Sequence, residues 1–221
     1  MQKQASLEEN EEGIVKLNKD YSQIFNIVTH ILEDPNMLVF IEAIKTIENL
    51  AILLKQTIKP AKMKQFLKLL ADKYKETKTA VLTSLETCFD AIFENRCLPP
   101  TQFFDLLINN IATTHKNPRV KQLVLDRVEL IIEKNYMDEH HKPTNNSQLG
   151  QVFKQNKDKL KQIILKDTNA GVRDAGVSLL ALFRIVLGSE GLFIDFEPVL
   201  EVINSLPKQR VSEITNRLEI F

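Results

Sequence analysis

The sequence predicts an all-α protein, an α-solenoid of HEAT-like helix pairs, on three observations. Apolar residues recur at three- and four-residue spacing along almost the whole chain, which is the period of amphipathic helices. The 221 residues include only 6 glycines and 8 prolines, too few for an all-β chain built on tight turns. Short polar breaks separate the apolar stripes at a nearly regular interval, as in helical repeats. We expect about ten or eleven helices in about five to six repeats, the first incomplete.

The apolar stripes give the expected helices in chain order. One stripe runs from Tyr21 to Leu32, the next from Phe40 to Leu54, and a third from Met63 to Tyr74. Further stripes run through Leu82, Leu85, Phe89 and Ile92, through Val120, Val124, Val128 and Ile131, and through Val172, Leu179, Phe183 and Val186. No segment alternates strictly enough to predict a strand.

The polar breaks carry the repeat period. They lie near 34–36, 75–79, 115–118 and 167–171, and each leads into a helix with a valine in its first turn: Val39, Val81, Val120 and Val172. The valines are 42, 39 and 52 residues apart, and an apolar residue stands eight positions after each. The last interval is longer because it contains a polar stretch, 135–150, which we interpret as an inserted loop. The remaining period is that of a two-helix HEAT or armadillo-type repeat.

The chemistry of the breaks explains the turns. Asn36, Asn117 and Asn169 are placed to act as N-caps, and Pro118 stands at the first helical position, where a missing N–H costs nothing. Pro60, Pro100 and Pro207 each mark the start of another helix, and Gly188 marks the end of one. A single helix pair cannot hide its apolar face, so the pairs must stack. We therefore expect one domain, 1–221, whose short turns line up along one edge.

Composition narrows the classes of function. The chain carries 29 basic and 29 acidic residues, a balance that argues against nucleic acid as the main partner. No apolar run has the roughly 18 residues of a membrane span, and the N-terminus is too polar for a secretory signal. Two cysteines exclude a disulfide framework and indicate a reducing compartment. Cys88 falls on an apolar face, whereas Cys97 follows Arg96, whose charge could lower its pKa.

The expected edge is cationic. Its basic residues are Lys75, Lys78, His115, Lys116, Arg119, Lys121, Lys166 and Arg173, diluted by Asp34, Glu76, Asp167 and Asp174. Basic residues of this kind are equally consistent with solvated turns. Met37 and Leu38 are equally consistent with the start of a buried apolar stripe. Arg173 is more informative, because the helix macrodipole disfavours a cation in the first turn. Contact with a partner explains it, and so does pairing with Asp167 or Asp174.

Chemistry-bearing motifs are few. The run 138–141, Asp-Glu-His-His, is a poor metal site because adjacent histidines do not easily face one ion and no further ligand lies at helical spacing. Glycine-rich phosphate loops and the nucleophile and zinc motifs of hydrolases are missing from the sequence. We therefore expect no enzyme activity, no metal and no cofactor.

Several of these segments together resemble a TOG domain, the tubulin-binding HEAT-repeat module of the microtubule polymerase family. The resemblance is carried by 74–78 (YKETK) before a helix ending at 89–93 (FDAIF), by 116–121 (KNPRVK), by 167–175 (DTNAGVRDA), and by the segment from Leu187 to the last helix, 199–221. It covers residues from about 20 to 221.

The resemblance implies a function and a site. It implies that the turns bind the αβ-tubulin heterodimer. The chain would be a monomeric module of a microtubule-associated protein that regulates microtubule polymerisation, in the cytoplasm on the cytoskeleton. Arg173 matches a principal contact of the family. The other implied contacts are Asn36, Met37, Leu38, Lys75, Lys78, Lys116, Asn117, Arg119, Lys121 and Asn169.

One departure from the family pattern bears on this function. The family presents a tryptophan in its first loop, and this chain has no tryptophan. The sequence is expected to begin inside the second helix of the first repeat, at 2–19, and to lack the helix and loop before it. It is therefore either a piece of a longer protein or a member with a reduced edge. The alternative function is a HEAT-repeat scaffold that binds another protein or peptide and has lost tubulin.

Overall fold

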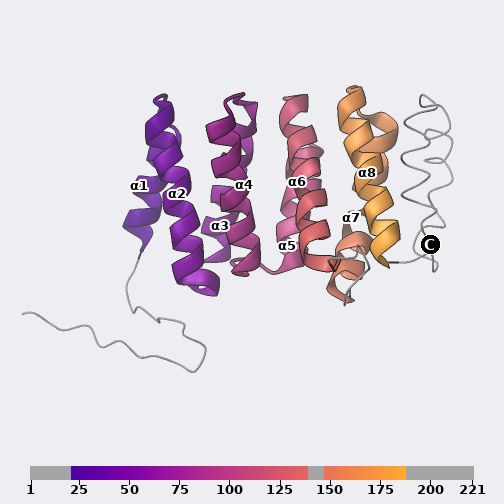
Figure 1. Cartoon of the computed structure of the whole chain (residues 1–221), viewed down its shortest axis with the longest axis horizontal. Coiled ribbons are helices and arrows are strands. Elements are labelled where there is room, and N and C mark those ends of the chain that lie inside the picture. Colours follow the sequence, from indigo (N-terminus) through magenta and orange to yellow (C-terminus); the bar gives the residue numbers. More distant parts are fainter. Residues whose placement is uncertain (1–20, 139–146, 188–221) are drawn as a thin grey trace, which may run out of the picture. The chain divides into compact units, whose positions relative to one another are not determined.

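The computed structural model describes residues 21–138 and 147–187, and the regular structure of these residues is entirely helical (Figure 1). Its helices follow one another in antiparallel pairs, as the sequence predicts. The first two pairs are α1 (Ser22–Leu32) with α2 (Met37–Leu54), and α3 (Pro60–Asp72) with α4 (Thr79–Glu94). The other two are α5 (Pro100–Asp105), continued by the π-helix η3 (Leu106–Ala112), with α6 (Pro118–Tyr136), and α7 (Ser147–Lys166) with α8 (Ala170–Leu187). Two short 3₁₀ turns, η1 (Lys55–Thr57) and η2 (Lys73–Lys75), follow α2 and α3.

Contacts divide the chain into two compact units, residues 1–99 and residues 100–221. In the first unit α1 packs against α2 and α3, while α2 packs against α4. In the second unit η3 packs against α6, α7 against α8, α5 against α7, and α6 against α8. Each unit thus stacks two pairs in two layers, and the predicted HEAT-like solenoid architecture is confirmed.

The core follows the predicted repeat phase with one difference. Val81, Val120 and Val172 are fully buried, and so are the residues eight positions after them, apart from a 6% exposure at Leu180. In the first pair Val39 is 36% exposed, and its neighbour Phe40 is buried in its place.

Aromatic rings join successive helices within each unit. Phe25 of α1 meets Phe66 of α3 edge-on, with ring centres 5.7 Å apart. Tyr74 of η2 stacks on Phe89 of α4 at 5.7 Å. In the second unit the rings of Phe153 and Phe183 lie 5.1 Å apart and join α7 to α8. Such pairs add about 0.5–1.5 kcal/mol each beyond the area they bury, which helps to hold the turns of each unit in place.

The end of α4 corrects the expectation for Cys97. Arg96 has a φ of 52°, and the N–H groups of Arg96 and Cys97 bond back to the carbonyls of Phe93 and Ile92, which is a Schellman motif. The motif turns Cys97 into the core, where it is 3% exposed. Burial therefore raises its pKa to about 12, whereas the neighbouring arginine was expected to lower it.

The predicted core position of Cys88 is confirmed. Its side chain is fully buried. Burial, with smaller contributions from Glu48 and Cys97, raises its pKa well above the ordinary value.

The predicted inserted loop is shorter than expected. Helix α6 continues to Tyr136 and α7 begins at Ser147, so both ends of the stretch 135–150 are helical. The tyrosine is buried and extends the apolar stripe of α6 beyond the polar residues that suggested a loop. The predictions for 2–19, for the histidines at 140–141, for Gly188, for Pro207 and for the last helix fall outside the described residues. Within residues 21–138 and 147–187, no helix is both long enough and apolar enough to cross a membrane.

Candidate functional site

The short loops of each unit lie together at one end of its helices. In the first unit these are the loops between α1 and α2 and between η2 and α4; in the second they are the loops between η3 and α6 and between α7 and α8 (Figure 1). The up-and-down path of the chain requires this, because every second connection returns to the same end of the stack. Each unit therefore presents two loops as one surface.

Three of the four loops share one hydrogen-bond pattern that ends in an asparagine. Asp34 Oδ1 accepts from the N–H of Asn36 at 2.7 Å, and Asp167 Oδ1 accepts from the N–H of Asn169 at 3.0 Å. In the third loop His115 Nδ1 takes the place of the carboxylate and accepts from the N–H of Asn117 at 3.1 Å. In this bond the His115 ring nitrogen takes the acceptor role that the aspartate carboxylates have in the other two loops.

The asparagines then cap the helices that follow, as predicted. Asn36 Oδ1 accepts from Leu38 N–H, Asn117 Oδ1 from Arg119 N–H, and Asn169 Oδ1 from Val172 N–H, at 3.0, 3.0 and 3.2 Å. Each cap satisfies one of the otherwise unbonded N–H groups of a first helical turn. Their side-chain oxygens are therefore occupied within the fold.

The remaining loop breaks the pattern at Lys78. This residue has the same extended backbone as the asparagines, with φ −76° and ψ 128°, but its side chain makes no capping bond. The lysine is exposed. A cation beside the positive end of a helix is also electrostatically unfavourable. The position thus gives up a cap and carries an unfavourable charge, and its ammonium is directed at solvent or at a partner.

The loops of the first unit also present an apolar group. Leu38 is 69% exposed at the start of α2, while Met37 is half-buried. The structure therefore decides between the two interpretations of these residues: Leu38 belongs to the surface and Phe40 to the core. Lys73 lies over the Phe40 ring, with Nζ 4.4 Å from the ring centre. It joins the second repeat of this unit to the first.

Asp167 is the centre of the second unit's loops. Its Oδ2 lies 2.8 Å from Nζ of Lys121, and the pair spans 46 residues of sequence. Burial disfavours the ionised form of Asp167, but the Lys121 hydrogen bond, the Asn169 N–H and the charges of Lys121 and Arg173 outweigh it and hold its pKa below the ordinary value. The carboxylate is therefore ionised at neutral pH and ties α6 to the loop before α8.

Arg173 lies in the first turn of α8, as predicted, and the structure shows what holds it there. Its NH1 donates to the backbone carbonyl of Asp167 at 2.8 Å. Of the two proposed partners, Asp167 is thus the one that it contacts, through the main chain. A guanidinium carries five N–H donors, so one bond to a carbonyl fixes its direction and leaves further donors for a partner.

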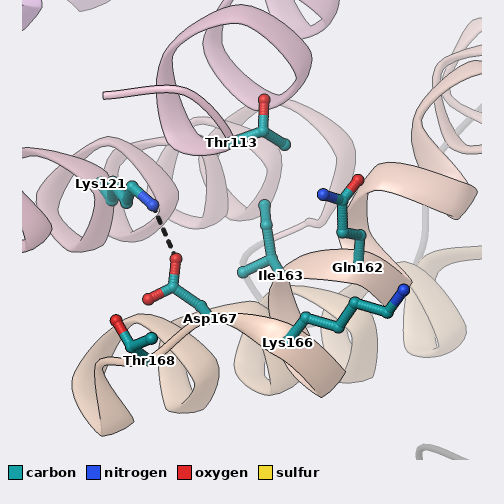
Figure 2. Close-up of a pocket in the computed structure, with 7 residues that line it drawn as sticks. All are labelled: Thr113, Lys121, Gln162, Ile163, Lys166, Asp167 and Thr168. Atoms are coloured by element: carbon teal, nitrogen blue, oxygen red, sulfur yellow. Dashed lines mark hydrogen bonds and ion pairs between the residues drawn. The ribbon is translucent and has the colours of Figure 1, made fainter. Parts of the chain in front are cut away.

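A polar pocket of about 210 Å³ lies beside this ion pair (Figure 2). Lys121 and Asp167 bound it on one side and Gln162 and Lys166 on the other, and the Lys166 side chain points away from the pair. Thr113, at the end of the π-helix, closes a third side. Lys166 was expected at the edge on charge alone; that it shares a hollow with Gln162 and Thr113 follows only from the folded arrangement.

The other predicted site residues differ in how free they are. Lys116 is exposed and makes no hydrogen bond or ion pair with any residue in the described ranges, whereas Nζ of Lys75 lies 2.7 Å from Asp72 Oδ2. That pair is exposed on both sides, and such pairs contribute little stability, so the Lys75 ammonium can exchange partners at small cost. Arg119 is exposed on the first turn of α6.

Comparison with known proteins identifies the family of this chain. The family model described as the CLASP N-terminal region matches residues 3–186. The chain belongs to the CLASP N-terminal family. The match includes all four loops and every predicted site residue.

Solved structures of related fold agree with this family. The MAST/Orbit N-terminal domain superposes with a TM-score of 0.68 at 16% identity, over 92% of this chain and 81% of that one. A chain solved in work on tubulin recruitment by microtubule polymerases with TOG domain arrays gives 0.66 at 17% identity, over 93% and 39%. A Crescerin chain from a TOG domain array gives 0.62 at 16% identity, over 90% and 74%. At these identities the likeness shows the fold, which is that of a TOG domain.

A sequence relative is also known. The chain is 27% identical over 220 residues to protein MOR1 of Arabidopsis thaliana. The match covers 93% of this chain and 10% of MOR1, so the chain spans about a tenth of that relative's length.

Sequence reasoning missed the supports of the site. Asp167 was considered as a charge that dilutes the edge and as a possible partner of Arg173, but not as a partner of Lys121, and Lys73 was not considered at all. The shared pattern of an acceptor two residues before each capping asparagine was visible in the sequence and could have predicted the role of Asp167 in its own loop. Its pairing with Lys121, 46 positions away, had no local signal.

Proposed function

We propose that this chain binds the αβ-tubulin heterodimer through the loops at one end of its helices. It would act as a module of a microtubule-associated protein that regulates microtubule polymerisation, with the cytoskeleton as its place of action. Membership of the CLASP N-terminal family and the TOG fold support the proposal. The proposal is one of binding: the loops offer shape and charge to a partner.

The observation that carries the proposal is the uncompensated charge on exposed residues of the loops. Lys78 forgoes a helix cap and Lys116 has no partner among the described residues, while Leu38 exposes 69% of its surface. Cations beside an exposed apolar side chain suit a partner surface that carries carboxylates around an apolar patch. Arg173 supplies further donors that match a carboxylate.

The test is co-elution with purified αβ-tubulin in size-exclusion chromatography. We expect a complex with the wild-type chain, which Arg173→Ala and Lys116→Glu weaken. Lys154→Glu is the matched control, because Lys154 is an exposed lysine of α7 about 18 Å along the helix from its loop end. We expect this control to leave the complex intact.

Two outcomes would overturn the proposal in different ways. Loss of the complex with the control variant as well would indicate binding by overall charge and not by the loops. Absence of a wild-type complex would favour a scaffold for another protein. Because the charges involved are local, we also expect the complex to weaken with added salt over the range where the Debye length falls below about 10 Å.

A further inference from the structure

Asp167 uses every polar atom it has to connect three parts of the second unit. Its N–H donates to the Ile163 carbonyl of α7. Its carboxylate accepts from Lys121 of α6 and from the N–H of Asn169 in its own loop. Its carbonyl accepts from Arg173 of α8. A displacement of this one residue therefore changes the loop and the arginine together.

The ion pair that anchors Asp167 differs from two others among the described residues. The side chains of Lys121 and Asp167 are 17% and 8% exposed. The pairs Lys45–Glu42 and Lys75–Asp72 each join residues three positions apart, and all four of those side chains are at least 44% exposed. A sheltered pair is screened less by solvent and salt than an exposed one. The Lys121 ammonium is thus sheltered, and one of its three N–H donors is already bonded to Asp167.

Arg173 has the opposite properties. It is only partly buried, with one donor held by the Asp167 carbonyl. A free arginine side chain loses conformational entropy when a partner immobilises it. A guanidinium that the fold already holds in one direction loses less conformational entropy on binding. The bond to Asp167 therefore favours binding although the bond itself makes no contact with the partner.

We propose that Lys121 is a positioning residue for Arg173: it anchors Asp167, and Asp167 holds the arginine in the orientation that meets the partner. This inference rests on the proposed function, and it removes Lys121 from the set of residues that contact tubulin directly. Lys121 acts on the affinity only through Arg173.

A double-mutant cycle tests this role with αβ-tubulin as the probe. We expect Lys121→Met to weaken binding by about threefold to tenfold, the range set by the ordering of one long side chain. In an Arg173→Ala background the same substitution should have no further effect. Lys116→Met is the matched control, and its effect should multiply with that of Arg173→Ala. If the effects of Lys121→Met and Arg173→Ala multiply instead, Lys121 is a direct contact and the proposal is wrong.

Amide hydrogen exchange tests the anchor without any partner. The N–H groups of Asn169 and Val172 are bonded to Asp167 Oδ1 and Asn169 Oδ1. We expect Lys121→Met to speed their exchange and to leave that of Leu38, which is bonded to the cap of the first unit, unchanged. Equal exchange in wild type and variant would overturn the anchor. A normal exchange response together with no wild-type tubulin complex would instead show that the proposed function had failed.

Discussion

The ammonium of Lys73 lies 4.4 Å from the centre of the Phe40 ring. Lys73 belongs to η2 and Phe40 to α2, so the contact joins the two repeats of the first unit next to their loops. Lys121 and Asp167 make the corresponding connection in the second unit. In both units a lysine from one repeat reaches the neighbouring repeat, and the loop surface is braced by side chains as well as by packing.

The first prediction concerns this cation–π contact. Burial and the charge of Lys75 lower the pKa of Lys73, while Asp72, Glu76 and Glu33 oppose the shift. A single substitution would mix that penalty with the ring contact, so a cycle of Lys73→Met and Phe40→Leu is required. We expect a favourable coupling of about 0.5–1 kcal/mol in urea unfolding. The control is a cycle of Lys68→Met and Phe40→Leu, because Lys68 is an exposed lysine of α3. We expect no coupling energy in this control cycle.

The second prediction concerns the uncapped helix. Lys78→Asn introduces the cap that three other loops have, on a backbone that already suits it. We expect the free energy of unfolding to rise by about 1 kcal/mol and, because a contact cation is lost, tubulin binding to weaken. Thr77→Asn, one position outside the cap, should not stabilise. An unchanged stability in Lys78→Asn would contradict the shared loop pattern.

The third prediction concerns an existing cap. Asn117→Ala leaves the Arg119 N–H without its side-chain acceptor, and we expect a loss of about 1 kcal/mol in urea unfolding. Asn117→Gly should cost only a few tenths of a kcal/mol, because glycine lets water reach the same N–H. Equal losses would show that the side chain contributes by packing and not by capping.

The fourth prediction concerns pH. The pKa of Asp167 in the folded chain lies below its ordinary value of 3.8, so protons bind more tightly to the unfolded state. The resulting stability is present above that value and is lost as pH falls through the folded pKa. We expect Asp167→Asn to cost about 1.5–3 kcal/mol at neutral pH. The gap between variant and wild type should close at acid pH in matched urea titrations, and a gap that stays constant would show that the charge is not its cause.

The fifth prediction concerns the two cysteines. Both are buried, and the pKa of Cys97 is raised to about 12, so neither presents a thiolate at neutral pH. We expect both thiols to react with an alkylating agent only at the rate at which the chain opens. Urea above the unfolding midpoint should restore rapid reaction. Fast labelling of Cys97 in the native chain would contradict this prediction and support the lowered pKa that the sequence suggested.

Much of the fold could be predicted, because its signals are local. The helical period, the capping asparagines and the starts at Pro60, Pro100 and Pro118 each depend on residues within one or two turns, and the structure confirms them. Boundaries near 135–150 were wrong, since a polar sequence does not reveal that Tyr136 finds a buried place against other helices. The exposure of Val39 was missed for the same reason.

The site could be predicted only as a set of loops. Charge and position pointed to Lys78, Lys116 and Arg173, but apart from Arg173 the sequence offered no reason to distinguish one edge cation from another. The structure separates them, because the ammonium of Lys121 is sheltered and paired whereas Lys116 is exposed. His115 was counted among the cations, and its ring nitrogen accepts a hydrogen bond from the backbone of its own loop.

By itself the sequence determined the helical class, the repeat period and the capped loops, because helix formation and capping depend on neighbours within a few residues. Only the tertiary structure decided which charges are free. Lys121 and Asp167 lie 46 positions apart, and their pairing exists only once α6 and α8 pack together. That packing also sets the direction of Arg173, since the carbonyl that holds it belongs to the residue that Lys121 anchors.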